Sequence, residues 1–166
     1  MPLTEEAFTT LVDNGCLDCR GRKLSVEAIV VQKLPLLAGE LHGSPSWGYK
    51  GEDFVRGAYR IACEACSKEL YAASSCPLCD AEGGVERALA RGSAFPLPAK
   101  CGSCESELLT ATAYVPARVS YDGARASKPR AQARPDEEGF HALRAECKQC
   151  HAVEEHRGAC GLCGGD

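Results

Sequence analysis

The chain lacks any run of about 18 consecutive apolar residues, the length that a membrane-spanning helix needs. It also lacks the start of a secretory signal peptide, because Met1–Glu6 is acidic and no long apolar stretch follows it. We therefore expect a protein with no membrane segment that stays in the cytoplasm. A reducing cytoplasm keeps thiols free, so paired cysteines there predict metal binding or redox chemistry rather than disulfides.

Aromatic residues and catalytic motifs are also scarce. The 166 residues include four Phe, five Tyr and one Trp. Small units with so few large side chains bury little apolar surface and usually need staples such as metal ions. The sequence contains no Gly-x-Ser-x-Gly, His-Glu-x-x-His or Walker A segment. It therefore predicts a small, metal-stabilised protein that is not an enzyme.

Cysteine is abundant in this chain, and its spacing indicates a specific chemistry. All twelve cysteines lie in Cys-x-x-Cys pairs. The pairs are Cys16/Cys19, Cys63/Cys66, Cys76/Cys79, Cys101/Cys104, Cys147/Cys150 and Cys160/Cys163. This spacing is typical of metal ligands, and it is not the usual spacing of a disulfide framework, although an even count permits one. We expect all twelve to be ligands, with zinc as the metal and rubredoxin-like iron as the alternative.

The cysteine pattern occurs twice in the same order. Cys101 follows Cys16 by 85 positions, and Cys147 follows Cys63 by 84. The fold class that we predict is β-rich and metal-stabilised, with two tandem zinc-ribbon-like repeats related by a pseudo-twofold axis and a short N-terminal helix. The expected divisions are a helix over 1–15, repeat one over 16–84, a linker over 85–100 and repeat two over 101–166.

Local patterns predict the elements around these cysteines. Thr4 can cap a helix over residues 4–14, and Gly15 suits the end of that helix. Alternating apolar residues predict strands. These strands cover residues 24–31, 55–61, 109–115 and 143–145, and a short helix is expected over 85–90. Long irregular loops should join the two strands of each repeat, and such loops often carry function.

Two pairs have the form of known zinc knuckles. Cys76-Pro77-Leu78-Cys79 resembles the Cys-Pro-x-Cys knuckle of zinc-ribbon and double-zinc-ribbon modules, and Cys160-Gly161-Leu162-Cys163-Gly164 resembles the related form with a final glycine. The resemblance covers the knuckles and the adjoining strands, roughly a quarter of the chain. It implies a zinc-ribbon fold and does not identify a function.

Each repeat holds three cysteine pairs, and a four-thiolate site uses two. If all sites lie within one chain, three ions bind and one of them joins the repeats. We expect Cys63/Cys66 to bind with Cys76/Cys79, and Cys147/Cys150 with Cys160/Cys163, so that Cys16, Cys19, Cys101 and Cys104 form the joining site. In the alternative, each first pair binds with its middle pair, and Cys76/Cys79 and Cys160/Cys163 form the joining site.

Two loops are the candidate recognition surfaces. Segment 118–134 has a charge balance of +4 and contains Arg118, Arg125, Lys128, Arg130 and Arg134. Trp47 and Tyr49 lie in the first long loop and are typical protein-contact residues. The formal charge of −4 would fall to about −10 with three zinc ions on twelve thiolates. We therefore expect a protein-binding adaptor or regulator, and the alternative is a nucleic-acid-binding zinc ribbon that uses segment 118–134.

Overall fold

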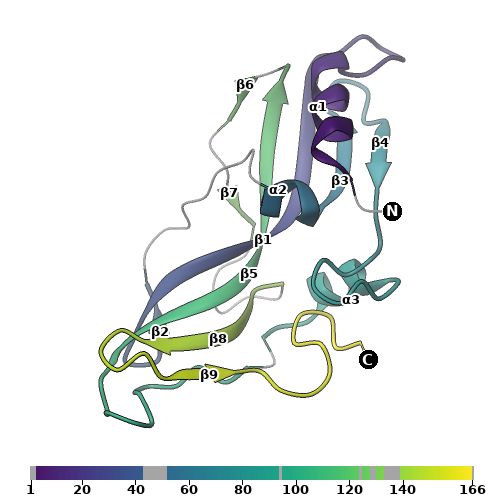
Figure 1. The fold of residues 1–166 in the computed structure, drawn as a ribbon. Helices are drawn as coiled ribbons and strands as arrows, with labels where there is room; N and C mark the ends of the chain where they lie inside the picture. Colours follow the sequence, from purple (N-terminus) through teal and green to yellow (C-terminus); the bar gives the residue numbers. More distant parts are fainter. Residues whose placement is uncertain are drawn as a thin grey trace.

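The computed structural model describes residues 3–42, 52–93, 95–123, 125–127, 130–132 and 139–165. In these ranges three helices accompany a single β-sheet (Figure 1). The helices are α1 (Glu5–Asn14), α2 (Glu52–Gly57) and α3 (Gly84–Ala90). The strands are β1 (Lys23–Leu37), β2 (Glu40–Leu41), β3 (Ala58–Cys63), β4 (Glu69–Ala72), β5 (Leu108–Asp122), β6 (Arg125–Ala126), β7 (Arg130–Ala131), β8 (His141–Cys147) and β9 (Val153–Glu155).

The first helix forms where the sequence predicts it. The Thr4 side chain accepts a hydrogen bond from the Ala7 amide, and Gly15 ends the helix at a φ of 68°. Phe8 and Val12, one turn apart on the helix, are buried against the sheet. The predicted N-terminal helix and its cap are therefore confirmed.

Two 15-residue strands, β1 and β5, form the central ribbon of the molecule. They are antiparallel and pair along their whole length, from Lys23 opposite Asp122 to Leu37 opposite Leu108. At about 3.4 Å per residue the ribbon is about 45 Å long. Its length separates the segments that lie at its two ends.

Shorter strands extend the ribbon at both ends in the order β4-β3-β1-β5-β8-β9 (Figure 1). β3 pairs with the first half of β1, and β8 pairs with the first half of β5. A β-bulge interrupts each ladder, with Tyr59 as the extra residue in β3 and Leu143 in β8. Each end of the ribbon therefore carries a hairpin with the same kind of irregularity.

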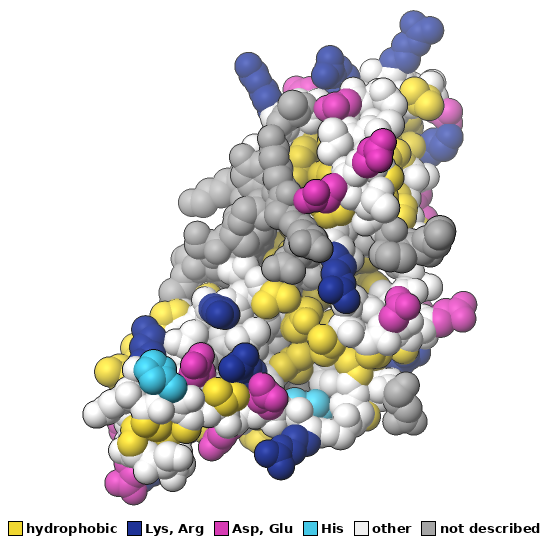
Figure 2. Space-filling model, viewed as in Figure 1, with side chains coloured by type: hydrophobic (Ala, Val, Ile, Leu, Met, Phe, Trp, Pro, Cys, Tyr) yellow, Lys and Arg dark blue, Asp and Glu magenta, His cyan; other side chains and the backbone are white. Residues whose placement is uncertain are grey.

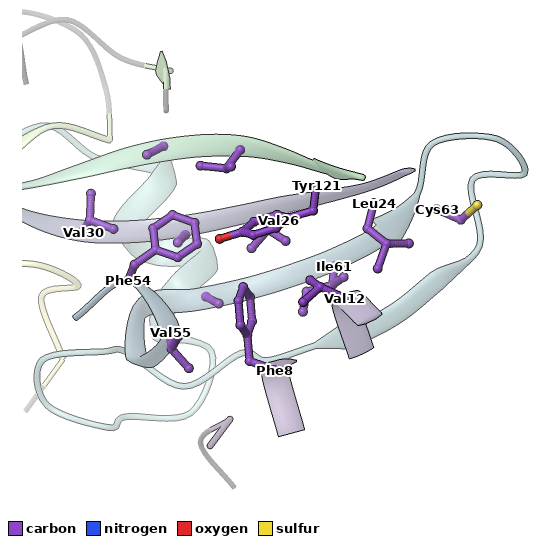
Figure 3. Close-up of a cluster of buried hydrophobic side chains, with 14 of the residues drawn as sticks. Phe8, Val12, Leu24, Val26, Val30, Phe54, Val55, Ile61, Cys63 and Tyr121 are labelled. Carbon is purple, nitrogen blue, oxygen red and sulfur yellow. The ribbon is translucent and has the colours of Figure 1, made fainter. Parts of the chain in front are cut away.

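Both faces of the ribbon carry buried hydrophobic side chains. The even-numbered residues of β1 contribute Leu24 and Val26 to a core beneath α1 and α2, and Leu34 and Leu36 to a second core at the far end. Figure 3 shows the first core, where Phe8 lies between the helix and the sheet. A third cluster covers the opposite face in the middle, where Ile29 meets side chains from α3 and the C-terminal segment. In the described ranges, three small cores therefore replace one large core.

The strand predictions are right in position and wrong in extent. β1 continues beyond the predicted end at residue 31, and β5 continues beyond residue 115. Pro35 and Pro116 lie within these strands, and each carbonyl accepts a hydrogen bond on the outer side, from the amides of His42 and Gln132 respectively. Because a residue in an antiparallel ladder directs its N–H and C=O to the same side, the missing N–H groups face outward and the β1–β5 ladder loses no hydrogen bond. Val55 lies in α2 and not in the predicted strand, because β3 begins only at Ala58.

Three candidate metal centres

The structure brings all twelve cysteines into three groups of four. The first cluster is Cys16, Cys19, Cys63 and Cys66; the second is Cys101, Cys104, Cys147 and Cys150; the third is Cys76, Cys79, Cys160 and Cys163. Within each cluster the four sulfur atoms lie within 4.8 Å of one another. None of the twelve cysteines, all of which are described, forms a disulfide. Each cluster could therefore hold a metal ion.

Strand pairing builds the first cluster. Cys63 ends β3 opposite Leu24, near the start of β1, and the Cys16/Cys19 pair precedes that start. The Cys19 and Cys63 sulfurs are 3.4 Å apart, and the Cys16 and Cys66 sulfurs are 3.7 Å apart. One cysteine of each pair, Cys16 and Cys63, is buried, while Cys19 and Cys66 are exposed. The cluster closes the end of the ribbon that lies beneath α1.

The same arrangement builds the second cluster at the other end. Cys147 ends β8 opposite Leu109 of β5. The sulfur of Cys104 lies 3.5 Å from that of Cys147, and the sulfur of Cys101 lies 3.5 Å from that of Cys150. The first and second clusters therefore lie at opposite ends of the β1–β5 ribbon, because the strands that follow Cys19 and Cys104 run antiparallel to each other.

The third cluster joins segments that are far apart in the sequence. The sulfurs of Cys76 and Cys160 are 3.9 Å apart, and those of Cys79 and Cys163 are 3.5 Å apart. Cys76 and Cys163 pack with Leu162, which is fully buried, in the core on the middle of the ribbon. This cluster connects the C-terminal segment to the chain that precedes α3.

The six Cys-x-x-Cys turns, or knuckles, share one backbone geometry. In each, the amide of the first cysteine donates to the carbonyl five residues later, as from Cys16 to Gly21. The residue after the second cysteine has a positive φ in every knuckle. These residues are Arg20, Ser67, Asp80, Glu105, His151 and Gly164, with φ between 61° and 75°. Five of the six lack the conformational freedom of glycine, so the knuckle geometry overrides local preference.

The sulfur positions fit tetrahedral coordination. A Zn–S distance of about 2.3 Å corresponds to a sulfur–sulfur edge of about 3.8 Å. The contacts between pairs range from 3.4 Å to 3.9 Å. Backbone amides point at the sulfurs, for example those of Leu78 toward Cys76 and Ser103 toward Cys101, both at 3.4 Å. Such amides stabilise thiolate, the form that binds metal.

The thiols within a cluster differ in acidity. The Cys150 amide lowers the pKa of Cys147 to about 6, and the Cys66 amide lowers the pKa of Cys63 to about 7. By contrast, the pKa of Cys104 is raised to about 12. The Ser106 amide acts to lower this pKa, but the neighbouring sulfurs of Cys147 and Cys150 oppose a further negative charge and raise it. A cation at the centre of the cluster would remove that repulsion.

The favoured pairing prediction is wrong, and the alternative pairing is the one that the structure shows. β4 is antiparallel to β3, and Ala72 lies opposite Arg60. The chain therefore runs away from Cys63 before it reaches Cys76, and the two cysteines are not brought together. β9 likewise runs back along β8, away from Cys147. The predicted joining site of Cys16, Cys19, Cys101 and Cys104 cannot form, because these two pairs lie at opposite ends of the ribbon.

The predicted recognition residues have different positions. Arg118 lies in β5 and not in a loop. From this strand it donates to the Ser25 hydroxyl at 2.8 Å, and it lies 3.8 Å from the Glu64 carboxylate. Arg125 in β6 and Arg130 in β7 are exposed, and Arg130 is the cross-strand partner of Arg118. Trp47, Tyr49, Lys128 and Arg134 lie outside the described residues.

Sequence reasoning overlooked one buried residue beside the third cluster. His141 is fully buried, and its Nε2 lies 2.7 Å from the Ala88 carbonyl of α3. Burial lowers the pKa of His141, so the neutral ring donates through Nε2. It therefore ties β8 to the helix that packs on Cys76 and Cys163. The one sequence signal for its burial is its position at the start of a segment in which apolar residues alternate.

No protein-family model, curated protein or solved structure matches this chain. Of the helices that the structure describes, none has the length and apolar character needed to cross a membrane.

Proposed function

We propose that this protein is a non-enzymatic, zinc-stabilised scaffold that acts as a protein-interaction adaptor or regulator. The observation that carries the proposal is that every cysteine belongs to a cluster of four sulfurs. Four thiolates fill the coordination shell of zinc, whereas catalytic zinc keeps a position open for water or substrate. The metal would therefore be structural, and the protein surface would bind the partner.

Zinc is the proposed metal, with three ions per chain. The edge lengths of the clusters suit a tetrahedral thiolate shell, which iron also accepts. Native mass spectrometry should show three zinc ions, and the purified protein should be colourless. Chelation under reducing conditions should unfold the protein, because binding energy at such sites is folding energy. A chelated sample that keeps a dispersed amide NMR spectrum would contradict the structural role.

The duplication and its pseudo-twofold arrangement belong to the same proposal. The strand order supports it, since β4, β3 and β1 correspond in turn to β9, β8 and β5. The two bulge residues, Tyr59 and Leu143, are 84 positions apart, the same offset as Cys63 and Cys147. A scaffold of two similar halves would then have diverged in its connecting segments, where we place recognition.

Nucleic-acid binding remains the second candidate, and one observation favours it. Arg118 and Arg130 are direct cross-strand partners, and exposed Arg125 lies on the neighbouring strand β6. Like charges directly opposite each other are destabilising, and in this pair Arg118 already lies 3.8 Å from the Glu64 carboxylate. A phosphate backbone could supply further anions to Arg130 and Arg125.

A single comparison separates the two candidates. In affinity purification, an adaptor should recover a protein partner that is lost with Trp47→Ala and kept when Arg125 and Arg130 are changed to Glu. A nucleic-acid-binding protein should copurify with nucleic acid that salt removes. The two arginine reversals should then abolish the copurification, which would contradict the adaptor proposal.

A further inference from the structure

A groove lies beside the N-terminal helix, and no cysteine lines it. Its volume is about 260 Å³, and one wall is the α1 face formed by Glu5, Phe8, Thr9, Val12 and Asp13. These residues follow the spacing of a single helical face. Small-molecule pockets usually have about 300–1,000 Å³. The groove is therefore better suited to a side chain of a partner than to a whole small molecule.

The floor of the groove is apolar and packed. Val55 of α2 and Tyr121 of β5 form the part of this floor that faces α1. The rings of Phe8 and Tyr121 meet edge to face, with centroids 5.5 Å apart and an interplanar angle of 81°. Figure 3 shows Phe8, Val55 and Tyr121 converging from three elements. A floor that is already packed needs no rearrangement to receive an apolar group.

The two ends of the groove are acidic. Glu5 and Asp13 are exposed, and they are eight positions apart along the helix, a distance of about 12 Å. α1 also contains Glu6 and has no basic residue. Figure 2 shows acidic side chains beside hydrophobic ones at the end of the molecule that carries α1, where basic side chains also lie. An anionic ligand such as a phosphate backbone is therefore disfavoured here.

We propose that this groove binds an extended segment of a protein partner in which one apolar side chain is flanked by lysine or arginine two residues away on each side. In an extended chain, residues four apart are separated by about 13 Å, which matches the spacing of Glu5 and Asp13. The central apolar side chain would then lie beside Thr9, over the floor. This inference rests on the proposed adaptor function, for which it names the kind of partner.

The test uses the zinc-loaded full chain, labelled with ¹⁵N, and the peptide Gly-Lys-Ser-Leu-Ser-Lys-Gly. Amide shifts should change along α1 and at Val55 and Tyr121. Thr9→Trp fills the groove and should weaken binding about tenfold. Thr10→Trp, on the same helix but outside the groove, should change it less than about twofold. Glu5→Lys should weaken binding about fivefold, and Glu6→Lys, a matched reversal in the same helical turn, should have little effect.

Several results would overturn the inference. One is the absence of peptide binding, and another is binding that Thr9→Trp and Thr10→Trp weaken equally. Equal losses with Glu5→Lys and Glu6→Lys would indicate general electrostatic attraction. Self-association of the chain that Thr9→Trp abolishes would assign the groove to a second copy and contradict the partner named here. Three bound zinc ions in each variant would exclude misfolding as the cause of lost binding.

The adaptor function can fail separately. If wild-type protein recovers a partner and Thr9→Trp recovers the same amount, the adaptor proposal stands and the groove is not its docking site. If the peptide binds the groove but affinity purification recovers nucleic acid in place of a protein, the groove assignment stands and the adaptor proposal fails.

Discussion

Cys63 lies directly opposite Leu24 in the antiparallel ladder between β3 and β1. This one register position brings the Cys63/Cys66 knuckle to the Cys16/Cys19 knuckle, which precedes β1. The corresponding pair of Cys147 and Leu109 does the same between β8 and β5. The first two clusters are therefore products of strand register, whereas the third depends on how α3 and the C-terminal segment pack on the ribbon.

The third cluster should be separable from the other two. We expect the double variant Cys79→Ser and Cys163→Ser to bind two zinc ions in native mass spectrometry. The amide shifts of β1 and β5 should remain, because the first two clusters are built within their own ladders. The shifts of α3 and the C-terminal segment should change. Loss of all three metals would show that the ribbon itself depends on the third cluster.

Gly84 should be essential to that cluster. A Cβ added there would lie 2.4 Å from the Cys76 Cβ and 2.9 Å from the Cys76 backbone, so the knuckle would have to shift. Gly84→Ala should destabilise the protein by about 1–3 kcal/mol, as overpacking usually does. Gly92→Ala is the matched control, since nothing lies within 4 Å of its added Cβ. Thermal unfolding of both variants checks the difference, and equal stability would contradict the clash.

Backbone strain in the knuckles should be measurable. Glu105 has a φ of 63°, a conformation that costs a residue with a Cβ about 1–2 kcal/mol. Glu105→Gly should therefore raise the stability of the zinc-loaded protein by up to about 1 kcal/mol, allowing for the greater entropy of the unfolded chain. Gly164→Ala, the reverse change at a φ of 75°, should lower it by at least a similar amount, because the added Cβ would also lie 2.4 Å from the Arg91 guanidinium. A melting temperature that falls for Glu105→Gly would oppose this account.

Acid should empty the first and second clusters. The folded-state pKa of Cys63 is about 7 and that of Cys147 about 6, both below the ordinary thiol value. Each thiolate therefore stabilises the fold at high pH, and this contribution is lost as the pH falls through the folded-state value. ¹¹³Cd NMR of the cadmium-loaded protein should show the signals of both clusters vanish as the pH falls, because protons compete with the metal for the thiolates. Signals that persist in strong acid would contradict thiolate ligation.

Local chemistry made several features predictable. Thr4, Gly15 and the apolar residues between them identify α1, and short-range alternation identifies the centres of the strands. The extent of β1 and β5 was not predictable in this way. Proline normally marks a strand end, and Pro35 and Pro116 are tolerated because their nitrogens face away from the β1–β5 ladder, on the side where His42 and Gln132 donate to their carbonyls.

Arg118 shows the same limit at the level of function. Its segment is basic and rich in turn residues, which predicts an irregular loop. In the structure it continues β5, because Val119 and Tyr121 find a core beneath α1 and α2. The groove at α1 was equally hidden, since Val55 and Tyr121 come from distant parts of the chain.

The sequence by itself determined the ligand type, the knuckle spacing and the number of clusters, because a Cys-x-x-Cys turn is a local structure of a few residues. Only the tertiary structure decided which knuckles share a cluster. That choice depends on the register of Cys63 with Leu24 and on the antiparallel direction of β1 and β5, and these are contacts between residues far apart in the chain. The β3–β4 hairpin carries Cys76 away from the Cys63/Cys66 pair, which is the nearest pair in the sequence, and toward Cys160.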